Sequence, residues 1–381
     1  MKKNILIIIL VAVVIAGVWS YQHSGRNIEI KQPIKIGVAT ILSGDFAFLG
    51  ENVANTVKLA VEDVNNSGGI NGRKFEIVVE DAKCDSKGGL DAIQKLVNID
   101  GVRYIIGGMC SNGTIAAAPV ANEKHALIMT PVTGGKNVDE AGQYIFRTAN
   151  SDVLAGRDLA DAVLKLGYKN IGVVAEVTEY TLDIKKTFEN GIKNGGGNIV
   201  VSEEFQTNTK DYRTLIAKIK ERKPEALLIL SQTGTNAAYF IKQSKEQGFE
   251  VPLFTDFTFA TNENAKKIAG SFDGIYFADP AYAADDPRMI AFLERYKTTY
   301  GITSAIPFHT SASYDAVMMY ADALRAVGDD SVKVHDWLLK NVKNRKGFMG
   351  TYSLDDKGNS DLGFVIKQII NGKPVKVESK K

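Results

Sequence analysis

The stretch Tyr-Ile-Ile-Gly-Gly-Met-Cys-Ser-Asn-Gly-Thr, residues 104–114, carries the pattern around which the rest of the chain is organised. The apolar run 102–106 predicts a strand buried on both faces, and the two glycines after it allow the backbone to turn sharply. Ser111 and its polar neighbours favour the start of a helix, expected over residues 115–124. Such a junction presents unpaired backbone N–H groups and the positive end of a helix, which together bind anions.

The same stretch has a simpler interpretation as an ordinary strand-to-helix turn in which Ser111 only caps its helix. It contains no lysine and no Walker pattern, so a bound anion is better explained as a carboxylate than as a triphosphate. From this stretch alone both interpretations stay open.

Outward from this stretch, strand and helix patterns alternate, which predicts parallel sheets with right-handed crossovers. The expected strands are 34–41, 75–81, 102–106, 127–131, 145–148, 171–175, 199–205, 226–231, 252–255 and 274–278. The expected helices are 49–66, 87–98, 115–124, 153–166, 182–193, 212–221, 237–247, 287–300, 309–327 and 334–343. Near the C-terminus, residues 350–354 and 363–370 are expected to pair as antiparallel strands around a turn at 355–358.

The N-terminus begins with Lys2 and Lys3, followed by the uncharged run 5–18. This is typical of a secretory signal, in which a basic segment precedes ~7–15 apolar residues, and it is shorter than the ~20 residues of a spanning helix. Trp19 and Tyr21 suit an anchor at a membrane interface. Residues 1–24 are therefore predicted to be a signal peptide or an N-terminal anchor, and the protein is expected in the periplasm or at the outer face of the cytoplasmic membrane.

The charge balance gives no reason to expect nucleic acid or an anionic membrane surface as a binding partner. The chain has 46 Lys and Arg against 44 Asp and Glu, and loss of the two leader lysines makes these numbers equal. With 24% charged and 45% hydrophobic residues, the composition is ordinary for a soluble globular protein. A length of 381 residues suggests two domains.

Two cysteines, Cys84 and Cys110, lie in a chain that is expected to be exported, which favours a disulfide. Both follow predicted strands of one parallel sheet, so their loops emerge at the same sheet edge, where Cα separations of ~4.4–6.8 Å are expected for a bridge. Two free thiols are the alternative. The four histidines lack the spacing of metal ligands, and no hydrolase or metalloprotease motif occurs, so neither a metal nor a cofactor is expected.

The first predicted strand is followed by Ser-Gly-Asp-Phe-Ala-Phe-Leu-Gly, residues 43–50. Its glycines are not spaced as in dinucleotide-binding loops. Its apolar residues Phe46, Phe48 and Leu49 fall at the carboxyl end of a strand, where open α/β sheets bind ligands. Packing against the next helix is the alternative for each of them.

Several motifs together resemble the leucine/isoleucine/valine-binding proteins, the extracytoplasmic solute receptors of branched-chain amino acid ABC transporters. The similarity runs from about residue 34 to about residue 367. The motifs are Leu42-Ser43-Gly44 with Ala47-x-x-Gly50, Asn65-x-x-Gly68-Gly69-Ile70-Asn71-Gly72, Asp81-x-x-Cys84-Asp85, Gly107-x-x-Cys110-Ser111, Asp211-Tyr212, Gly248 and Ser313-Tyr314-Asp315-Ala316.

The resemblance implies an α/β protein with the type I periplasmic-binding-protein fold, in which two doubly wound α/β lobes are joined by three crossover strands and enclose a ligand cleft. It places residues 34–147 and 277–349 in lobe 1, and residues 148–276 and 350–376 in lobe 2. It also implies a monomeric receptor that presents a small amino acid, of the branched-chain type or a related amide, to a membrane permease. Periodicity alone would have divided the chain into consecutive domains.

The resemblance also implies roles for individual residues. Ser111 corresponds to the serine that binds the ligand α-carboxylate, with help from Val132 and Thr133. Tyr180 corresponds to a tyrosine that closes over the ligand, and Asp256 is the nearest match to the acid that takes the α-ammonium.

Three departures from the family pattern concern the ligand side chain and one loop. Leu49, with Phe48 beside it, takes the place of an aromatic residue that often precedes the glycine of the first loop. Thr233 falls where the family has another tyrosine, so that phenol is absent. Gly134 and Gly135 replace a more usual Thr-x-Pro continuation.

Two other functions remain as alternatives. One is a ligand-sensing domain of the same fold, anchored by the N-terminal segment. The other is an exported hydrolase with Ser111 as nucleophile. The hydrolase needs a nearby base, and no histidine lies in a predicted ligand loop; His125 comes closest, at the opposite end of the helix that begins near Ser111.

Overall fold

The computed structural model describes residues 32–44, 46–232, 234–260, 262–304 and 306–377. The predicted leader, residues 1–24, and Thr233 lie outside these ranges. The chain divides into an N-terminal unit, Met1–Pro33, and a compact unit, Ile34–Lys381, and the second unit is described below. Within the described ranges, no helix has both the length and the apolar composition that a membrane span requires.

The first sheet contains five parallel strands in the order β2-β1-β3-β4-β5. Alternate residues of β1 serve two cores: Ile36 and Val38 pack with helices α2 and α12, whereas Ala39 packs with α3 and α4. Helices therefore cover both faces of this sheet. The strands are β1 (Ile34–Thr40), β2 (Phe75–Asp81), β3 (Tyr104–Gly107), β4 (Leu127–Thr130) and β5 (Ile145–Arg147), and the helices are α2 (Ala47–Asn66), α3 (Ser86–Gln94), α4 (Ser111–Glu123) and α12 (Pro307–Val327).

The second sheet has the order β14-β13-β10-β9-β8-β6-β7. Its five parallel strands are β6 (Asn170–Glu176), β7 (Asn198–Phe205), β8 (Ala226–Leu230), β9 (Leu253–Asp256) and β10 (Tyr276–Pro280), and β13 (Phe364–Ile370) and β14 (Lys373–Lys376) pair antiparallel at one edge. One face packs against α5 (Asp152–Lys165) and α6 (Glu179–Asn194), and the other against α7 (Arg213–Glu221) and α8 (Thr235–Glu246). The short helices α9 (Phe257–Ala260) and α10 (Glu263–Ala269) follow β9.

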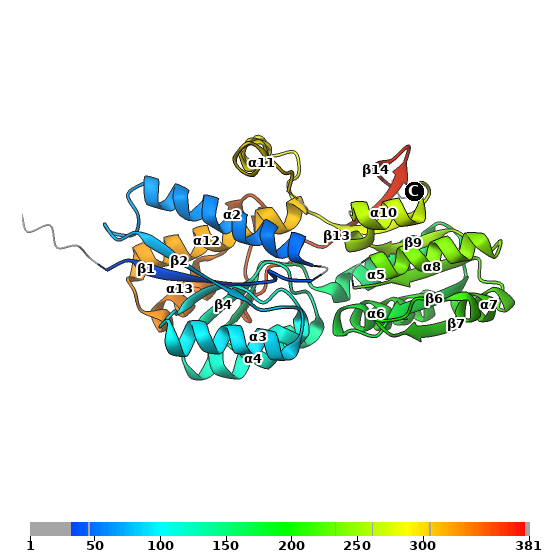
Figure 1. Ribbon diagram of the computed structural model, residues 1–381, viewed down its shortest axis with the longest axis horizontal. Helices are drawn as coiled ribbons and strands as arrows, with labels where there is room; N and C mark the ends of the chain where they lie inside the picture. Colours follow the sequence, from blue (N-terminus) through cyan, green and yellow to red (C-terminus); the bar gives the residue numbers. More distant parts are fainter. Residues whose placement is uncertain (1–31, 45, 233, 261, 305, 378–381) are drawn as a thin grey trace, which may run out of the picture. The chain divides into compact units, whose positions relative to one another are not determined.

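The chain passes three times between the two sheets. It leaves the first sheet after β5, returns after β10 through α11 (Pro287–Tyr300), and leaves again before β13. After the second passage, α12 lies against the first sheet, where the Tyr320 hydroxyl donates to the Ile105 and Leu127 carbonyls at 3.1 and 3.0 Å. Figure 1 shows each sheet with its own helices. This is the two-lobed type I periplasmic-binding-protein fold, as predicted; the lobe built on the first sheet is called lobe 1, and the other lobe 2.

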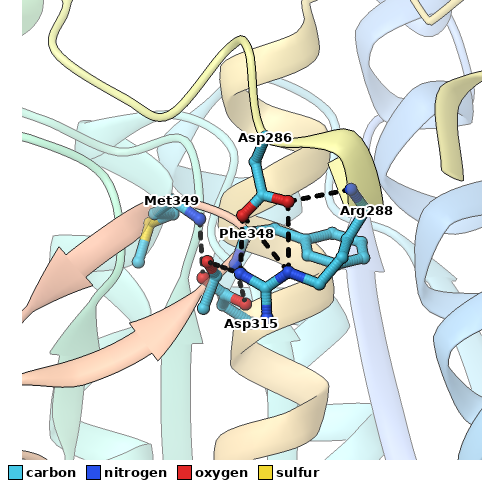
Figure 2. A network of polar contacts seen from close by, with 6 residues as sticks. Asp286, Arg288, Asp315, Phe348 and Met349 are labelled. Carbon is cyan, nitrogen blue, oxygen red and sulfur yellow. Dashed lines mark hydrogen bonds and ion pairs between the residues drawn. The ribbon is translucent and has the colours of Figure 1, made fainter. Parts of the chain in front are cut away.

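A polar network joins α12 to the hairpin of β11 (Arg345–Gly347) and β12 (Gly350–Tyr352). Figure 2 shows the Asp315 carboxylate facing the backbone of that hairpin, where Oδ1 accepts from Phe348 N and Oδ2 from Met349 N, both at 2.9 Å. The Nη2 atom of Arg288 donates to Asp286 Oδ2 at 2.6 Å and to the Gly347 carbonyl at 3.2 Å. The hairpin that precedes the third passage is thus held by the start of α11, which follows the second passage.

The expected antiparallel pair near the C-terminus is wrong. β12 pairs with β11, and β13 pairs with β10. The turn closes on itself, because Asp355 Oδ1 accepts from the backbone N–H groups of Lys357 and Asn359. After the turn, Leu354 and Ser360 form a single antiparallel bridge. Ser360 N donates to the Arg147 carbonyl at 2.9 Å, so the chain continues along the end of β5 instead of pairing with β12.

The other predicted strands and helices are confirmed with small shifts at their ends, including α13 (Ser331–Asn341). The shift that matters most is at α4, which begins at Ser111 rather than at residue 115, because the extended residue Cys110 precedes its first turn.

Candidate functional site

A cavity lies where the carboxyl ends of strands from both sheets meet, and its empty volume is about 820 Å³, including the solvent at its mouth. Lobe 1 supplies the segments after β1, β3 and β4, and lobe 2 supplies those after β6, β8 and β9. The predicted site residues in its wall are Phe48, Leu49, Ser111, Val132, Thr133 and Tyr180.

Ser111 is the first residue of α4 and is buried. Gly108 before it has φ +74°, and a Cβ atom there would overlap the Thr114 hydroxyl, so this approach of strand to helix requires glycine. The Ser111 Oγ accepts from Gly135 N at 3.2 Å, and this bond leaves its own proton for another acceptor. The N-terminus of α4 and this hydroxyl together suit a carboxylate.

The predicted disulfide between Cys84 and Cys110 is confirmed, with Cα atoms 5.4 Å apart. It ties the loop after β2 to the residue that precedes Ser111. The adjacent Asp85 caps α3 by accepting from Gly88 N at 2.6 Å, which anchors the other end of the bridge.

Thr133 and Val132 follow β4, as predicted, but the Thr133 hydroxyl is already used inside lobe 1. It lies 2.7 Å from the Thr130 hydroxyl and 3.2 Å from the Thr114 hydroxyl, and it donates to the Gly108 carbonyl. A hydroxyl has one proton and two lone pairs, so these contacts saturate it. The methyl group of Thr133 and the side chain of Val132 are what remain for the cavity.

Asp256 is the last residue of β9 and is only 1% exposed. Its Oδ1 accepts from Thr258 N at 2.7 Å and from the Thr258 hydroxyl. Burial raises the pKa of Asp256, and the bonds from Thr258 offset part of that rise. Asp256 itself does not line the cavity, whereas Thr258 and the neighbouring Tyr180 do.

Tyr180 lies in the first turn of α6, and its buried hydroxyl lies beside the Asp256 carboxylate and the Thr258 hydroxyl. Burial is the main reason that the pKa of Tyr180 is raised, and the charge of Asp256 is the next. The phenol therefore stays protonated at neutral pH.

Asp152 also lines the cavity, and sequence reasoning missed it. It is the first residue of α5 and is 4% exposed. An acidic residue in a first helical turn is the ordinary way to stabilise a helix dipole, so the sequence contained no sign of its burial. Asn150 and Gln232, which sequence reasoning also missed, lie in the same wall.

The rest of the wall is largely apolar. His309 lies there on α12, and its Nδ1 is 2.9 Å from the Pro131 carbonyl, an acceptor that requires the proton on Nδ1. Burial lowers the pKa of His309 to about 4, so this ring is neutral at pH 7. The apolar lining residues are Ile41, Phe46, Phe48, Leu49, Met109, Val132, Phe257, Ile306, Phe308 and Phe364.

The lobes thus differ in what they offer. Lobe 1 supplies a helix N-terminus, the Ser111 hydroxyl and apolar side chains, whereas lobe 2 supplies the Asp152 carboxylate and the Tyr180 phenol. This arrangement fits a small molecule with a negative group at one end, a positive group at the other and an apolar substituent.

Comparisons with known proteins agree with this geometry. A family profile described as periplasmic binding protein matches residues 33–362. The chain is 26% identical over 336 residues to the Leu/Ile/Val-binding protein of Escherichia coli (strain K12), covering 87% of this chain and 89% of the relative.

Two solved structures share the fold over most of the chain. The first is an ABC transporter substrate-binding protein from Desulfitobacterium hafniense in complex with Leu, with 25% identity, a TM-score of 0.74, and coverage of 91% of this chain and 100% of that one. The second is a solute-binding protein from R. palustris in complex with 4-hydroxybenzoate, with 20% identity, a TM-score of 0.81 and coverage of 91% and 96%. The second likeness concerns the fold alone.

Proposed function

The chain belongs to the periplasmic binding protein family, and we propose that it is an extracytoplasmic receptor that captures a small amino acid, of the branched-chain type or a related amide, and delivers it to an ABC transporter permease. The observation that carries this proposal is the opposed chemistry of the two lobes around one apolar cavity. The names of the relatives, which bind Leu or Leu, Ile and Val, support the ligand class.

In this proposal the ligand α-carboxylate binds at the N-terminus of α4 and at the Ser111 hydroxyl, and Val132 and Thr133 contact it from the next loop. Asp256 provides the counter-charge for the ammonium group, and Tyr180 closes over the ligand. Phe48 and Leu49 contact the ligand side chain. Thr233 is also proposed as a ligand-binding residue; it lies outside the described residues, and this assignment rests on the resemblance alone.

Ligand contacts with both lobes favour the closed form over the open form, so binding works by population shift about the three passages. The permease then recognises the closed form. We expect the receptor to act as a monomer outside the cytoplasmic membrane, because its equal numbers of acids and bases after the leader offer no strong field for another partner.

The site is poorly suited to hydrolysis. His309 is the only histidine in the cavity wall among the described residues, and its Nδ1 is bonded to the Pro131 carbonyl. With its pKa lowered to about 4 by burial, His309 is a weak base. The described residues therefore provide Ser111 with no histidine that is poised to activate it.

The test is to identify the ligand. Mass spectrometry of the small molecules released from natively purified protein should reveal an amino acid or its amide, and calorimetry with that compound should give a saturable 1:1 isotherm. Ligand recovered after long incubation should have an unchanged mass. Binding of 4-hydroxybenzoate but of no amino acid or amide would contradict the proposal, and turnover of the compound would indicate an enzyme.

A further inference from the structure

A second cavity lies within lobe 2, at the amino ends of β8, β9 and β10. Its empty volume is about 910 Å³, including the solvent at its mouth. The ligand cleft lies at the carboxyl ends of strands of the same sheet, and the two cavities share no lining residue. A molecule in the second cavity would therefore occupy a site that is separate from the cleft.

Ser244, on α8, lines the second cavity and is only 7% exposed. Its hydroxyl has no hydrogen-bond partner among the described residues. A serine inside a helix can bond the carbonyl four residues earlier, but Ser244 does not do so here. Because a buried hydroxyl without a partner costs free energy, Ser244 indicates a ligand group that completes its hydrogen bonding.

Three aromatic residues, Tyr168, Phe249 and Tyr276, also line this cavity. The turn that ends α8 brings Phe249 close to Ser244, since the Phe249 N–H donates to the Ser244 carbonyl at 2.9 Å. The Tyr276 ring stacks on the buried ring of Phe254, with centroids 4.8 Å apart and planes at 11°. Packing thus fixes these aromatic groups before a ligand arrives, which favours a flat ring as the ligand.

The charged residues of the wall, Lys245, Glu250 and Asp273, are all exposed. Two of them already bond the backbone: Lys245 Nζ donates to the Ala269 carbonyl at 3.3 Å, and Asp273 Oδ1 accepts from Gly372 N at 2.7 Å. An ionic ligand would lose its hydration without gaining a buried partner of opposite charge. The cavity therefore favours a neutral molecule.

We propose that the second cavity binds a neutral aromatic molecule that carries one hydrogen-bonding group, with its ring against the aromatic residues and its polar group at the Ser244 hydroxyl. A serine hydroxyl donates one hydrogen bond and accepts others, so the polar group of the ligand can be a hydroxyl, an N–H or a carbonyl. This site goes beyond the proposed function, because it requires no ligand in the cleft.

The experiment compares two probes of nearly equal size, phenol and toluene, which carry a hydroxyl and a methyl group on the same ring. Binding is followed in amide NMR spectra, because the resonances that shift identify the occupied cavity. Ser244→Ala removes the proposed hydrogen-bond partner. Ser202→Ala is the matched control, because Ser202 is exposed on β7 of the same lobe.

Both probes should shift the amide resonances of residues 248–253 and 271–276 saturably, and phenol should bind more tightly than toluene. Ser244→Ala should weaken phenol binding by about three- to tenfold, the effect of one neutral hydrogen bond, and should change toluene binding by less than about twofold. Ser244→Ala should not lower the melting temperature, because the hydroxyl that it removes has no partner in the ligand-free protein. Ser202→Ala should change the binding of neither probe.

Shifts confined to residues of the ligand cleft, or no saturable shift with either probe, would overturn the second site. Equal losses for phenol and toluene in Ser244→Ala, or a lower melting temperature of that variant, would overturn the role of the hydroxyl. These outcomes do not depend on whether the cleft binds an amino acid, so they leave the test of the proposed function separate.

Discussion

A Cβ atom at Gly134 would overlap the carboxylate of Asp152. The glycine after β4 in lobe 1 and the first residue of α5 in lobe 2 therefore share one space, and the Asp152 N–H donates to the Gly134 carbonyl at 2.8 Å. The next glycine is packed in the same way against Ser111, because a Cβ atom at Gly135 would lie 2.6 Å from the Ser111 Oγ. The Gly-Gly pair makes room for one polar side chain from each lobe.

We expect Gly134→Ala to weaken binding and to destabilise the fold. The added methyl group must displace the Asp152 carboxylate or the loop, and such overpacking typically costs ~1–3 kcal/mol. Gly135→Ala should instead affect the carboxylate end of the ligand, through Ser111. Calorimetry with an amino acid separates wild-type protein from each variant, and thermal unfolding of the same samples measures the loss of stability. Wild-type affinity and stability in Gly134→Ala would show that the Asp152 carboxylate can move without affecting binding or folding.

Removal of the disulfide should destabilise the protein and loosen the anion site. Loop closure over the 26-residue separation between Cys84 and Cys110 predicts a loss of roughly 3–4 kcal/mol. Denaturant unfolding of the double Cys→Ala variant measures this, and chemically reduced wild-type protein should give the same value. Alkylation of both cysteines in exported protein without reductant would contradict the bridge.

Ser111→Ala should separate ligand binding from helix capping. Cys110, not Ser111, occupies the cap position of α4, so the substitution removes only the 3.2 Å bond from Gly135 N and should cost less than about 1 kcal/mol of stability. If the hydroxyl donates to a ligand carboxylate, affinity should fall by roughly 1.5–3 kcal/mol. Calorimetry and thermal unfolding on the same samples decide this. A lower melting temperature with unchanged affinity would show that Ser111 stabilises the fold and does not bind the ligand.

Local patterns predicted the alternating elements and the loops that form the cleft. Ser111 was identified because a strand-to-helix junction is visible within a few residues of sequence. Asp152 was not, because its burial depends on Gly134 and on the packing of the other lobe, which leave no trace near position 152. The wrong hairpin has a similar cause, since the turn after Leu354 is local, whereas the partners of β12 and β13 are selected by distant parts of the sheets.

The polar network in Figure 2 predicts a pH-dependent component of stability. Burial raises the pKa of Asp315 from its ordinary value of 3.8 to about 6, although Met349 and Phe348 donate to the carboxylate. The folded protein thus holds this proton more tightly than the unfolded chain does. The contribution of Asp315 to stability must therefore decrease as pH rises through the window between those two values, by about 3 kcal/mol in total.

Denaturant unfolding of wild-type protein and of Asp315→Asn at several pH values tests this. The difference between their free energies of unfolding should fall from pH 4 to pH 7. His309 acts in the opposite direction, since its lowered pKa removes stability as pH falls from 6.5 towards 4, but it contributes to both proteins and cancels. Parallel curves for the two proteins would contradict the raised pKa of Asp315.

Two contacts connect the segment after β4 in lobe 1 to α6 in lobe 2. Lys136 N donates to Asp183 Oδ2 at 2.6 Å, and the Asn137 side chain donates to Glu179. The donors follow β4 of lobe 1 and the acceptors lie on α6 of lobe 2, so any motion that separates the lobes must break these bonds. They should therefore stabilise the closed form independently of which ligand is bound.

Asn137→Ala removes one of these contacts without changing the charge of the cleft. Asn137 is exposed, so the bond should contribute only about 0.5–1 kcal/mol, which corresponds to an affinity loss of about two- to fivefold. Because the variant acts on closure, an amino acid and its deaminated acid should lose the same factor. Small-angle scattering should show a smaller radius of gyration with saturating ligand in both wild type and variant, and the ligand-free variant should be more expanded. Asn341→Ala, at the end of α13 away from the cleft, is the control and should change neither quantity. An unchanged radius of gyration at saturation would exclude lobe closure, and a ligand-selective loss in Asn137→Ala would place that residue in the binding site instead.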